Sequence, residues 1–197
     1  MIKIGILGDI GSGKSYVAQS FGYPVFDADR EVSKLYKVDK KTFNKLKKIL
    51  PDYFDKFPIK KKQVLEAILD KNGNLKKIVK IIHKEIRKKM SVFLKKNSHR
   101  KIVILDIPLL LENKINDKNF ILIYVQSKKS EILKRLKKRK NFNQKLFQKF
   151  KKIQLPLDYK KKKSNFIIKN DFRKTTVKKY VKDIIKEILN ERNRIRY

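Results

Sequence analysis

One stretch of the sequence decides the fold, and it reads Gly8-Asp9-Ile10-Gly11-Ser12-Gly13-Lys14-Ser15. It fits a template that cradles phosphate groups: a glycine, four free positions, then Gly-Lys-Ser. Glycines let the backbone curl until successive N–H groups point at one centre and bind phosphate oxygens. The Lys14 ammonium can reach the β- and γ-phosphates, and the Ser15 hydroxyl can bind Mg²⁺. The stretch therefore predicts a phosphate-binding loop.

The flanks of this loop have the pattern that the motif requires. Residues 2–7 form an apolar run, typical of a strand buried on both faces. Residues 16–21 are amphipathic and predict a helix, whose positive end would face the phosphates. The alternative is a chance glycine-rich turn. It is the weaker reading, because the chain has only six glycines and three of them lie in this loop.

Length and composition set the outer bounds. A chain of 197 residues can bury one α/β core with insertions. The absence of cysteine excludes disulfides and thiolate metal sites, and two histidines argue against a histidine-based zinc site. No run of about 18 uncharged apolar residues is present, and the first apolar stretch is too short for a signal peptide. We expect a cytoplasmic protein with no membrane partner.

The charge balance is extreme: 54 lysines and arginines against 19 acidic residues give a formal net charge of +35. Such a balance raises the possibility of a nucleic-acid partner. The excess is mostly lysine, however, and it lies between apolar positions along nearly the whole chain. Solvated helix faces, or a cradle for a polyanionic substrate, explain that distribution. No basic block carries the interleaved aromatic residues of a single-strand binding platform, so we expect no specific nucleic-acid partner.

A second strand is predicted at residues 23–26, followed by two carboxylates, Asp27 and Asp29. Ligands of open α/β sheets lie beyond the carboxyl ends of the strands. A carboxylate there can accept the proton of an attacking hydroxyl, or hold Mg²⁺ through water. The alternative is an Asx turn or a helix N-cap, since Asp29 precedes a predicted helix at residues 30–36. The sequence leaves both readings open.

Residues 38–97 are helical in pattern and rich in lysine. Pro51, Pro58 and the turn at residues 72–74 interrupt them. Sixty residues between two strands exceed an ordinary crossover, so they predict a helical insertion that serves a specific substrate. His83 lies within it, where a lone histidine is more often a packed or exposed helix residue than a ligand.

Three further strands are predicted at residues 101–106, 119–125 and 164–168, which completes a parallel sheet of five. The first of these strands ends in Asp106, and an apolar strand that ends in an aspartate resembles the strand whose aspartate orders the Mg²⁺ shell. The alternative is an aspartate that serves the turn after the strand. A final helix is predicted at residues 177–189, with a frayed tail at 190–197.

Two arginines mark a candidate lid. Arg135 and Arg139 are four residues apart in a predicted helix at residues 130–139, so we expect them on one helix face. With only nine arginines in the chain, such a pair suggests bidentate binding of a transferring phosphoryl group. A lid that closes there would exclude water. The alternative is a solvated basic helix face. Residues 142–157 continue the lid, and Pro156 ends its helix.

Taken together, these segments resemble the dephospho-CoA kinase family from residue 1 to about 189. The resemblance rests on the phosphate loop, on Asp27-Ala28-Asp29, on residues 106–112 (Asp-Ile-Pro-Leu-Leu-Leu-Glu), on the two lid arginines, on Gln154 and on Asn170. It implies that Asp29 is the base on the acceptor hydroxyl, assisted in catalysis by Lys14, Arg135 and Arg139. It also implies that Asn170 touches the adenine. The implied ATP-binding residues are Gly8, Gly11, Ser12, Gly13, Lys14, Ser15, Tyr16, Arg139 and Asn170. The implied acceptor-binding residues are Asp29, His83, Pro108 and Leu109, with Ser15 as the metal ligand.

The resemblance further implies a fold and a reaction. The fold is a single P-loop kinase-like domain of three layers, α/β, with a central five-stranded parallel sheet. Its core is expected at residues 1–36, 100–126 and 164–189, with the helical acceptor-binding insertion at 37–99 and the small lid at 127–160. The reaction is ATP-dependent phosphorylation of the 3′-hydroxyl of dephospho-CoA by a monomer that uses Mg²⁺. The alternatives are another small-molecule kinase acting on a nucleoside or nucleotide, and a nucleotide-gated RNA-binding protein.

Overall fold

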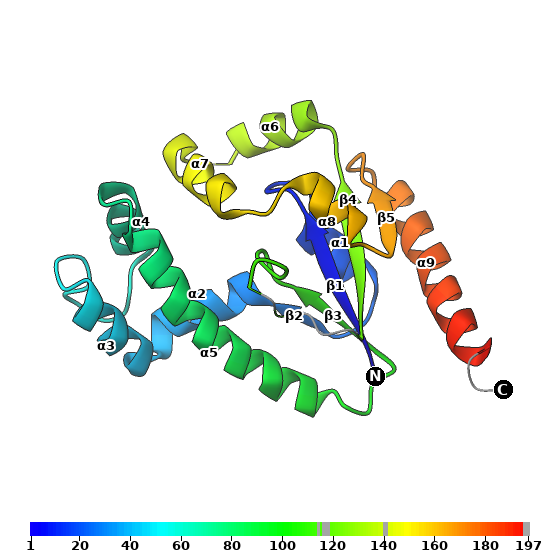
Figure 1. Cartoon of the computed structure of the whole chain (residues 1–197), viewed down its shortest axis with the longest axis horizontal. Coiled ribbons are helices and arrows are strands. Elements are labelled where there is room, and N and C mark those ends of the chain that lie inside the picture. Colours follow the sequence, from blue (N-terminus) through cyan, green and yellow to red (C-terminus); the bar gives the residue numbers. More distant parts are fainter. Residues whose placement is uncertain (114, 116–118, 140–141, 195–197) are drawn as a thin grey trace. The chain divides into compact units, whose positions relative to one another are not determined.

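A computed structural model describes residues 1–113, 115, 119–139 and 142–194. The described chain forms one five-stranded sheet, as the sequence predicts (Figure 1). Its order is β2 (Val25–Asp27), β3 (Ile102–Asp106), β1 (Ile2–Gly8), β4 (Phe120–Gln126) and β5 (Phe166–Lys169). β1 pairs in parallel with β3 and β4, and β4 pairs in parallel with β5. The loop that follows β1 therefore leaves the middle of the sheet.

Helices cover both faces of this sheet because its central strands are apolar on both sides. Ile4 and Ile6 of β1 are fully buried and point to the face covered by α1 (Lys14–Ser20) and α9 (Lys174–Arg194). Leu110 packs near Gly5 on the opposite face, and α8 (Leu157–Lys162) contacts β1. The predicted three-layer α/β architecture is confirmed.

The chain divides into two compact units. The sheet unit comprises Met1–Phe26, Asn97–Phe142 and Gln154–Tyr197, and the helical unit comprises Asp27–Lys96 and Asn143–Ile153. α6 (Lys129–Lys137) belongs to the sheet unit. The helical unit contains α2 (Ala28–Val38), α3 (Lys40–Ile49), α4 (Lys61–Asp70), α5 (Asn74–Lys96) and α7 (Gln144–Ile153).

The helical unit extends beyond the insertion expected at residues 37–99. It already includes α2, which packs against α3 and α5. It also includes α7, from within the range expected for the lid. Lys149 of α7 donates to the carbonyl oxygens of Ile68 and Leu69 at 2.8 and 3.3 Å, where α4 ends. These bonds satisfy carbonyl groups that a helix end leaves without a partner.

Several helix ends differ from the sequence-based expectation. α2 begins at Ala28 instead of residue 30, because the Asp27 carboxylate accepts a hydrogen bond from the Arg30 N–H at 2.9 Å and caps the helix. α9 runs from Lys174 to Arg194, so the frayed tail predicted from residue 190 is wrong for residues 190–194. No glycine or proline interrupts this stretch, so nothing in its composition stops the helix. None of the helices in the described ranges combines the length and apolar character that a bilayer crossing needs.

Candidate active site

The predicted phosphate loop joins β1 to α1. The Ser12 N–H donates to the Asp9 carbonyl at 3.2 Å, and the Asp9 carboxylate accepts from the Ile10 N–H at 2.7 Å. The Lys14 ammonium donates to the carbonyl oxygens of Asp9 and Gly8 at 2.7 and 3.3 Å. The loop is thus closed by its own hydrogen bonds, with the ammonium group folded over it.

Two glycines of this loop cannot carry a side chain. Gly13 has φ of 92°, and a Cβ there would lie 2.5 Å from Nδ2 of Asn170. A Cβ at Gly8, with φ of 148°, would lie 2.7 Å from the Val125 carbonyl oxygen. Both the backbone conformation and the close approach of Asn170 and Val125 therefore require glycine at these positions.

Two side chains from neighbouring strand ends hold the loop. Ser127, directly after β4, donates from its hydroxyl to the Ser12 carbonyl oxygen at 3.0 Å. Asn170, directly after β5, donates from Nδ2 to the same oxygen at 2.8 Å. Ser12 itself is fully buried, and no hydrogen-bond partner for its Oγ is found within the described ranges.

The segment after β5 is ordered by its own side chains. Oδ1 of Asn170 accepts from the Phe172 N–H at 2.9 Å, and Phe172 has a left-handed φ of 64°. The Arg173 N–H, and then the Thr176 hydroxyl, donate to the Asp171 carboxylate and hold its pKa below the usual value. This segment borders a cleft of about 610 Å³ at the carboxyl ends of β4 and β5. The cleft is lined by residues 126–128, 169–171, Glu131, Arg173, Thr176 and Tyr180.

The lid arginines differ in setting. Arg135 lies in α6 with its guanidinium 4.3 Å from the centre of the Phe172 ring. Arg139 follows the end of α6, where its N–H donates to the Leu136 carbonyl at 3.0 Å, and it is exposed. The prediction that both share one helix face is therefore wrong, because the helix ends at Lys137. α6 still abuts the phosphate loop, since a Cβ at Gly11 would lie 3.0 Å from the Leu136 side chain.

The segment after β3 leads to a buried ion pair. Asp106 ends β3 and is 5% exposed, and Pro108 and Leu109 lie in the turn that follows. Oε1 of Glu112 lies 2.6 Å from the Lys160 ammonium and accepts from the Leu155 N–H at 3.0 Å. The side chain of Lys160 is 1% exposed and that of Glu112 is 9% exposed. This pair ties α8 to the turn after β3.

Buried Tyr124 on β4 lies within electrostatic reach of two carboxylates. Burial raises the pKa of its hydroxyl, and the negative charges of Asp9 and Asp158 raise it further. Tyr124 therefore stays a neutral phenol.

The residues near the loop fit Mg²⁺. Ser15 lies exposed in the first turn of α1, and the Asp106 carboxylate ends the neighbouring strand. The described residues contain no cluster of three or more histidine, cysteine or acidic side chains that could hold a metal by itself. Mg²⁺ prefers oxygen ligands and is commonly held by one or two protein groups together with substrate phosphates.

The predicted acceptor residues fall in both units. Asp29 lies exposed in the first turn of α2, while Asp27 occupies the cap position. The N-cap alternative for Asp29 is therefore excluded. His83 is half-buried in α5, which packs against α2. Tyr36 of α2 also belongs to the helical unit, and burial raises the pKa of its hydroxyl to about 12.

Sequence reasoning assigned no role to Ser127, Phe172 or Lys160. Ser127 gave a weak signal, because it lies two residues after the strand predicted at 119–125, at the sheet edge where ligands bind. The other two gave no such signal. Lys160 stands in a run of lysines, and nothing in the sequence distinguishes the buried one.

Comparisons with known proteins agree with the motifs. The model of the dephospho-CoA kinase family matches residues 2–176. A dephospho-CoA kinase from Wolbachia sp. subsp. Brugia malayi (strain TRS) is 33% identical over 187 residues, which cover 92% of this chain and 95% of that protein. A solved structure from Thermus thermophilus has a TM-score of 0.71 at 23% identity, covering 96% of this chain and 97% of the other. A dephospho-CoA kinase from Campylobacter jejuni has a TM-score of 0.61 at 22% identity, covering 94% and 96%. The two structural likenesses concern the fold.

Proposed function

The chain belongs to the dephospho-CoA kinase family, and on that premise we propose how its residues divide the work of the reaction. The chain is an ATP-dependent kinase that phosphorylates the ribose 3′-hydroxyl of dephospho-CoA and so yields coenzyme A. One observation carries the proposal. The loop at residues 8–15 lies at the carboxyl end of the central strand, and a lysine closes over it.

The sheet unit binds ATP. Backbone N–H groups of the loop receive the phosphates, and the Lys14 ammonium exchanges its carbonyl partners for phosphate oxygens. Arg139, helped by Arg135, neutralises the charge that develops on the γ-phosphoryl group. The cleft beside residues 169–171 takes the nucleoside. Tyr16, exposed in the first turn of α1, belongs to the same site.

The helical unit, with His83, and the turn at Pro108 and Leu109 bind dephospho-CoA. Asp29 accepts the proton of the 3′-hydroxyl as that oxygen attacks the γ-phosphorus. The bond from the γ-phosphorus to the β,γ-bridging oxygen of ATP breaks, and that oxygen leaves on the β-phosphate of ADP. Asp29 suits this role because its carboxylate is exposed and the helix cap is already supplied by Asp27.

Ser15 supplies the protein's ligand to Mg²⁺. When bound, the ion would offset the negative charge of the triphosphate. We propose three functional divisions of the chain: a core at residues 1–36, 100–126 and 164–189, an acceptor-binding insertion at 37–99, and a lid at 127–160. We also propose a monomer, in which every assigned role falls to residues of one chain, and a cytoplasmic location.

A pair of substitutions two residues apart tests the proposal. We expect D29N to lower kcat by about a hundredfold or more, the usual contribution of a positioned base, with the Kd for ATP unchanged. D27N is the matched control, because asparagine caps helices as well as aspartate does, and its kcat should stay within about twofold. Steady-state kinetics and ATP titrations measure both. An unchanged kcat in D29N removes Asp29 from its role as the base.

A further inference from the structure

We infer that Asn170 and Ser127 position the phosphate loop, and that the Asn170 amide serves the triphosphate instead of reading the adenine base. The inference rests on the proposed function, because it assigns both residues to the binding of ATP. It concerns contacts within the sheet unit alone. Asn170 acts here as a positioning residue, since its side chain reaches the loop backbone.

Both polar atoms of the Asn170 side chain already have partners inside the protein. Nδ2 donates to the Ser12 carbonyl oxygen at 2.8 Å, and Oδ1 accepts from the Phe172 N–H at 2.9 Å. The residue is 3% exposed, and its backbone N–H donates to the Gln126 carbonyl at 2.7 Å. Reading a base would require the amide to give up a buried bond, and a buried group left without a partner is costly.

The Ser12 carbonyl oxygen receives two donors from different strand ends. Ser127 donates at 3.0 Å from the end of β4, and Asn170 donates at 2.8 Å from the end of β5. A carbonyl oxygen has two lone pairs, so these two bonds use its full capacity. The loop is thereby anchored to two strands of the sheet at one atom.

Anchoring this carbonyl fixes an N–H group of the loop. The Ser12 carbonyl and the Gly13 N–H belong to one planar trans peptide, in which they point in opposite directions. Holding the oxygen toward Ser127 and Asn170 therefore directs the Gly13 N–H away from them. Gly13 is the N-cap residue of α1, so its N–H has no acceptor within the helix and is available to phosphate.

The bare glycine at position 13 makes the anchor possible. A Cβ there would lie 2.5 Å from Nδ2 of Asn170 and 3.4 Å from the Phe172 ring. Phe172 holds a left-handed φ of 64°, which is uncommon for a bulky residue, and Oδ1 of Asn170 bonds its N–H. The ring of Phe172 in turn lies under the Arg135 guanidinium, 4.3 Å from the ring centre. One asparagine thus connects the phosphate loop to the segment that contacts the lid arginine.

Binding measurements without any acceptor separate the two roles of Asn170. Dissociation constants are measured in Mg²⁺ for ATP, for ITP and for inorganic tripolyphosphate, with wild type, N170A, S127A and the double variant. ITP lacks the exocyclic amine of adenine, and tripolyphosphate lacks a base altogether. N74A is the matched control, because Asn74 is 2% exposed and its amide likewise donates to a backbone carbonyl, that of Ala67, at 2.9 Å.

We expect N170A to raise all three constants by a similar factor, about three- to tenfold for one hydrogen bond, and to leave the ATP-to-ITP ratio unchanged. S127A should show the same pattern more weakly. The double variant should fall short of the product of the two effects, since both bonds end on one oxygen. N74A should lower the melting temperature and leave the three constants within about twofold, which separates positioning from general loss of stability.

Two results would overturn the inference. One is an N170A protein that loses its preference for ATP over ITP while its affinity for tripolyphosphate stays unchanged. The other is a folded S127A protein with wild-type constants for all three ligands, which is informative even where N170A fails to fold. A wild-type chain that binds none of the ligands overturns the proposed function itself.

Discussion

Lys160 shows how burial changes the meaning of a single residue. It stands in a run of lysines that the sequence places on a solvated face, yet its side chain is 1% exposed and its ammonium lies 2.6 Å from Glu112. Oε1 of Glu112 also accepts from the Leu155 N–H, while Oε2 is buried without a hydrogen-bond partner in the described ranges. The short Lys160–Glu112 contact and the bond from Leu155 stabilise the buried Oε1 of Glu112. Oε2 has lost its contact with water, and no hydrogen bond in the described ranges compensates that loss.

Breaking this pair should be strongly destabilising. E112Q leaves the Lys160 ammonium buried without a counter-charge, and we expect a loss of about 3–5 kcal/mol in the free energy of unfolding. K161M, at an exposed lysine next to it, is the matched control and should change stability by less than about 0.5 kcal/mol. Urea unfolding at pH 7 measures both. A loss below about 1 kcal/mol in E112Q would mean that water or another anionic group compensates the charge of Lys160.

The phosphate loop is the part of the candidate site that a sequence can predict at the residue scale. Its function depends on eight consecutive residues, and glycine, lysine and serine at fixed spacing state the chemistry directly. Ser127, Phe172 and Lys160 could not be predicted in the same way. Their roles arise when segments more than 30 residues apart meet, and their residue types are common in any loop or basic helix.

At the scale of elements, α3 and α5 of the helical unit are joined by charge as well as by apolar packing. The Glu85 carboxylate accepts from Lys45 of α3 at 2.6 Å and from Lys88 of its own helix at 3.2 Å. The hydrogen bond from Lys45, and then that from Lys88, hold the pKa of Glu85 below its usual value of 4.5. Its side chain is 12% exposed, so solvent screens it only partly.

This pair should make the stability of the helical unit depend on pH. A carboxyl group with a lowered pKa in the folded state stabilises the fold above its unfolded pKa and loses that contribution as the pH falls through the folded one. E85Q should therefore cost about 0.5–1 kcal/mol at pH 7. The difference from wild type should shrink as the pH falls below 4.5. Urea unfolding across this pH range measures it.

Glu66 offers the control for this measurement. It lies 3.7 Å from Lys62 within α4, and both side chains are largely exposed, at 54% and 84%. E66Q should change stability by no more than about 0.3 kcal/mol at any pH, because solvent screens the pair. Equal losses in E85Q and E66Q, or a loss in E85Q that persists at low pH, would contradict the assigned role of Glu85.

The elements themselves were largely predictable, and the contact of α7 with the end of α4 was not. All five strands were predicted within two residues at each end, because buried parallel strands are short apolar runs between turn signals. Helix ends shifted where a side chain caps them, as Asp27 does for α2. The assignment of α7 to the helical unit depends on bonds from Lys149 to residues 80 and 81 positions earlier, and no local pattern contains that information.

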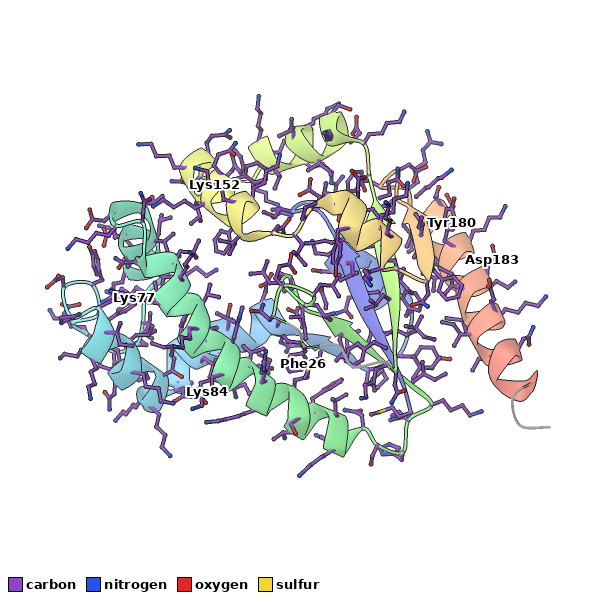
Figure 2. All side chains as sticks on the ribbon, in the orientation of Figure 1. Phe26, Lys77, Lys84, Lys152, Tyr180 and Asp183 are labelled. Carbon is purple, nitrogen blue, oxygen red and sulfur yellow. The ribbon has the colours of Figure 1, made fainter. Side chains whose placement is uncertain are left out.

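At the scale of the whole molecule, the positive charge lies mainly on exposed lysines. Figure 2 shows Lys77, Lys84 and Lys152 extending from the helices of the helical unit, and all three are exposed. Lysines of this kind keep their hydration shells and interact with polyanions in a salt-dependent way, without reading a sequence. The net charge of +35 therefore bears on solubility and on attraction of polyanions, and the phosphate loop determines the reaction.

The most direct test of the central claim is ATP consumption by the purified chain in Mg²⁺ with dephospho-CoA, adenosine or AMP as the acceptor. We expect turnover with dephospho-CoA alone, and a product that carries the new phosphate on the 3′-oxygen. Faster turnover with adenosine or AMP would keep the phosphate loop chemistry and contradict the acceptor. Bound ATP without turnover on any acceptor, together with salt-sensitive binding of RNA, would contradict the claim that this chain is a kinase of dephospho-CoA.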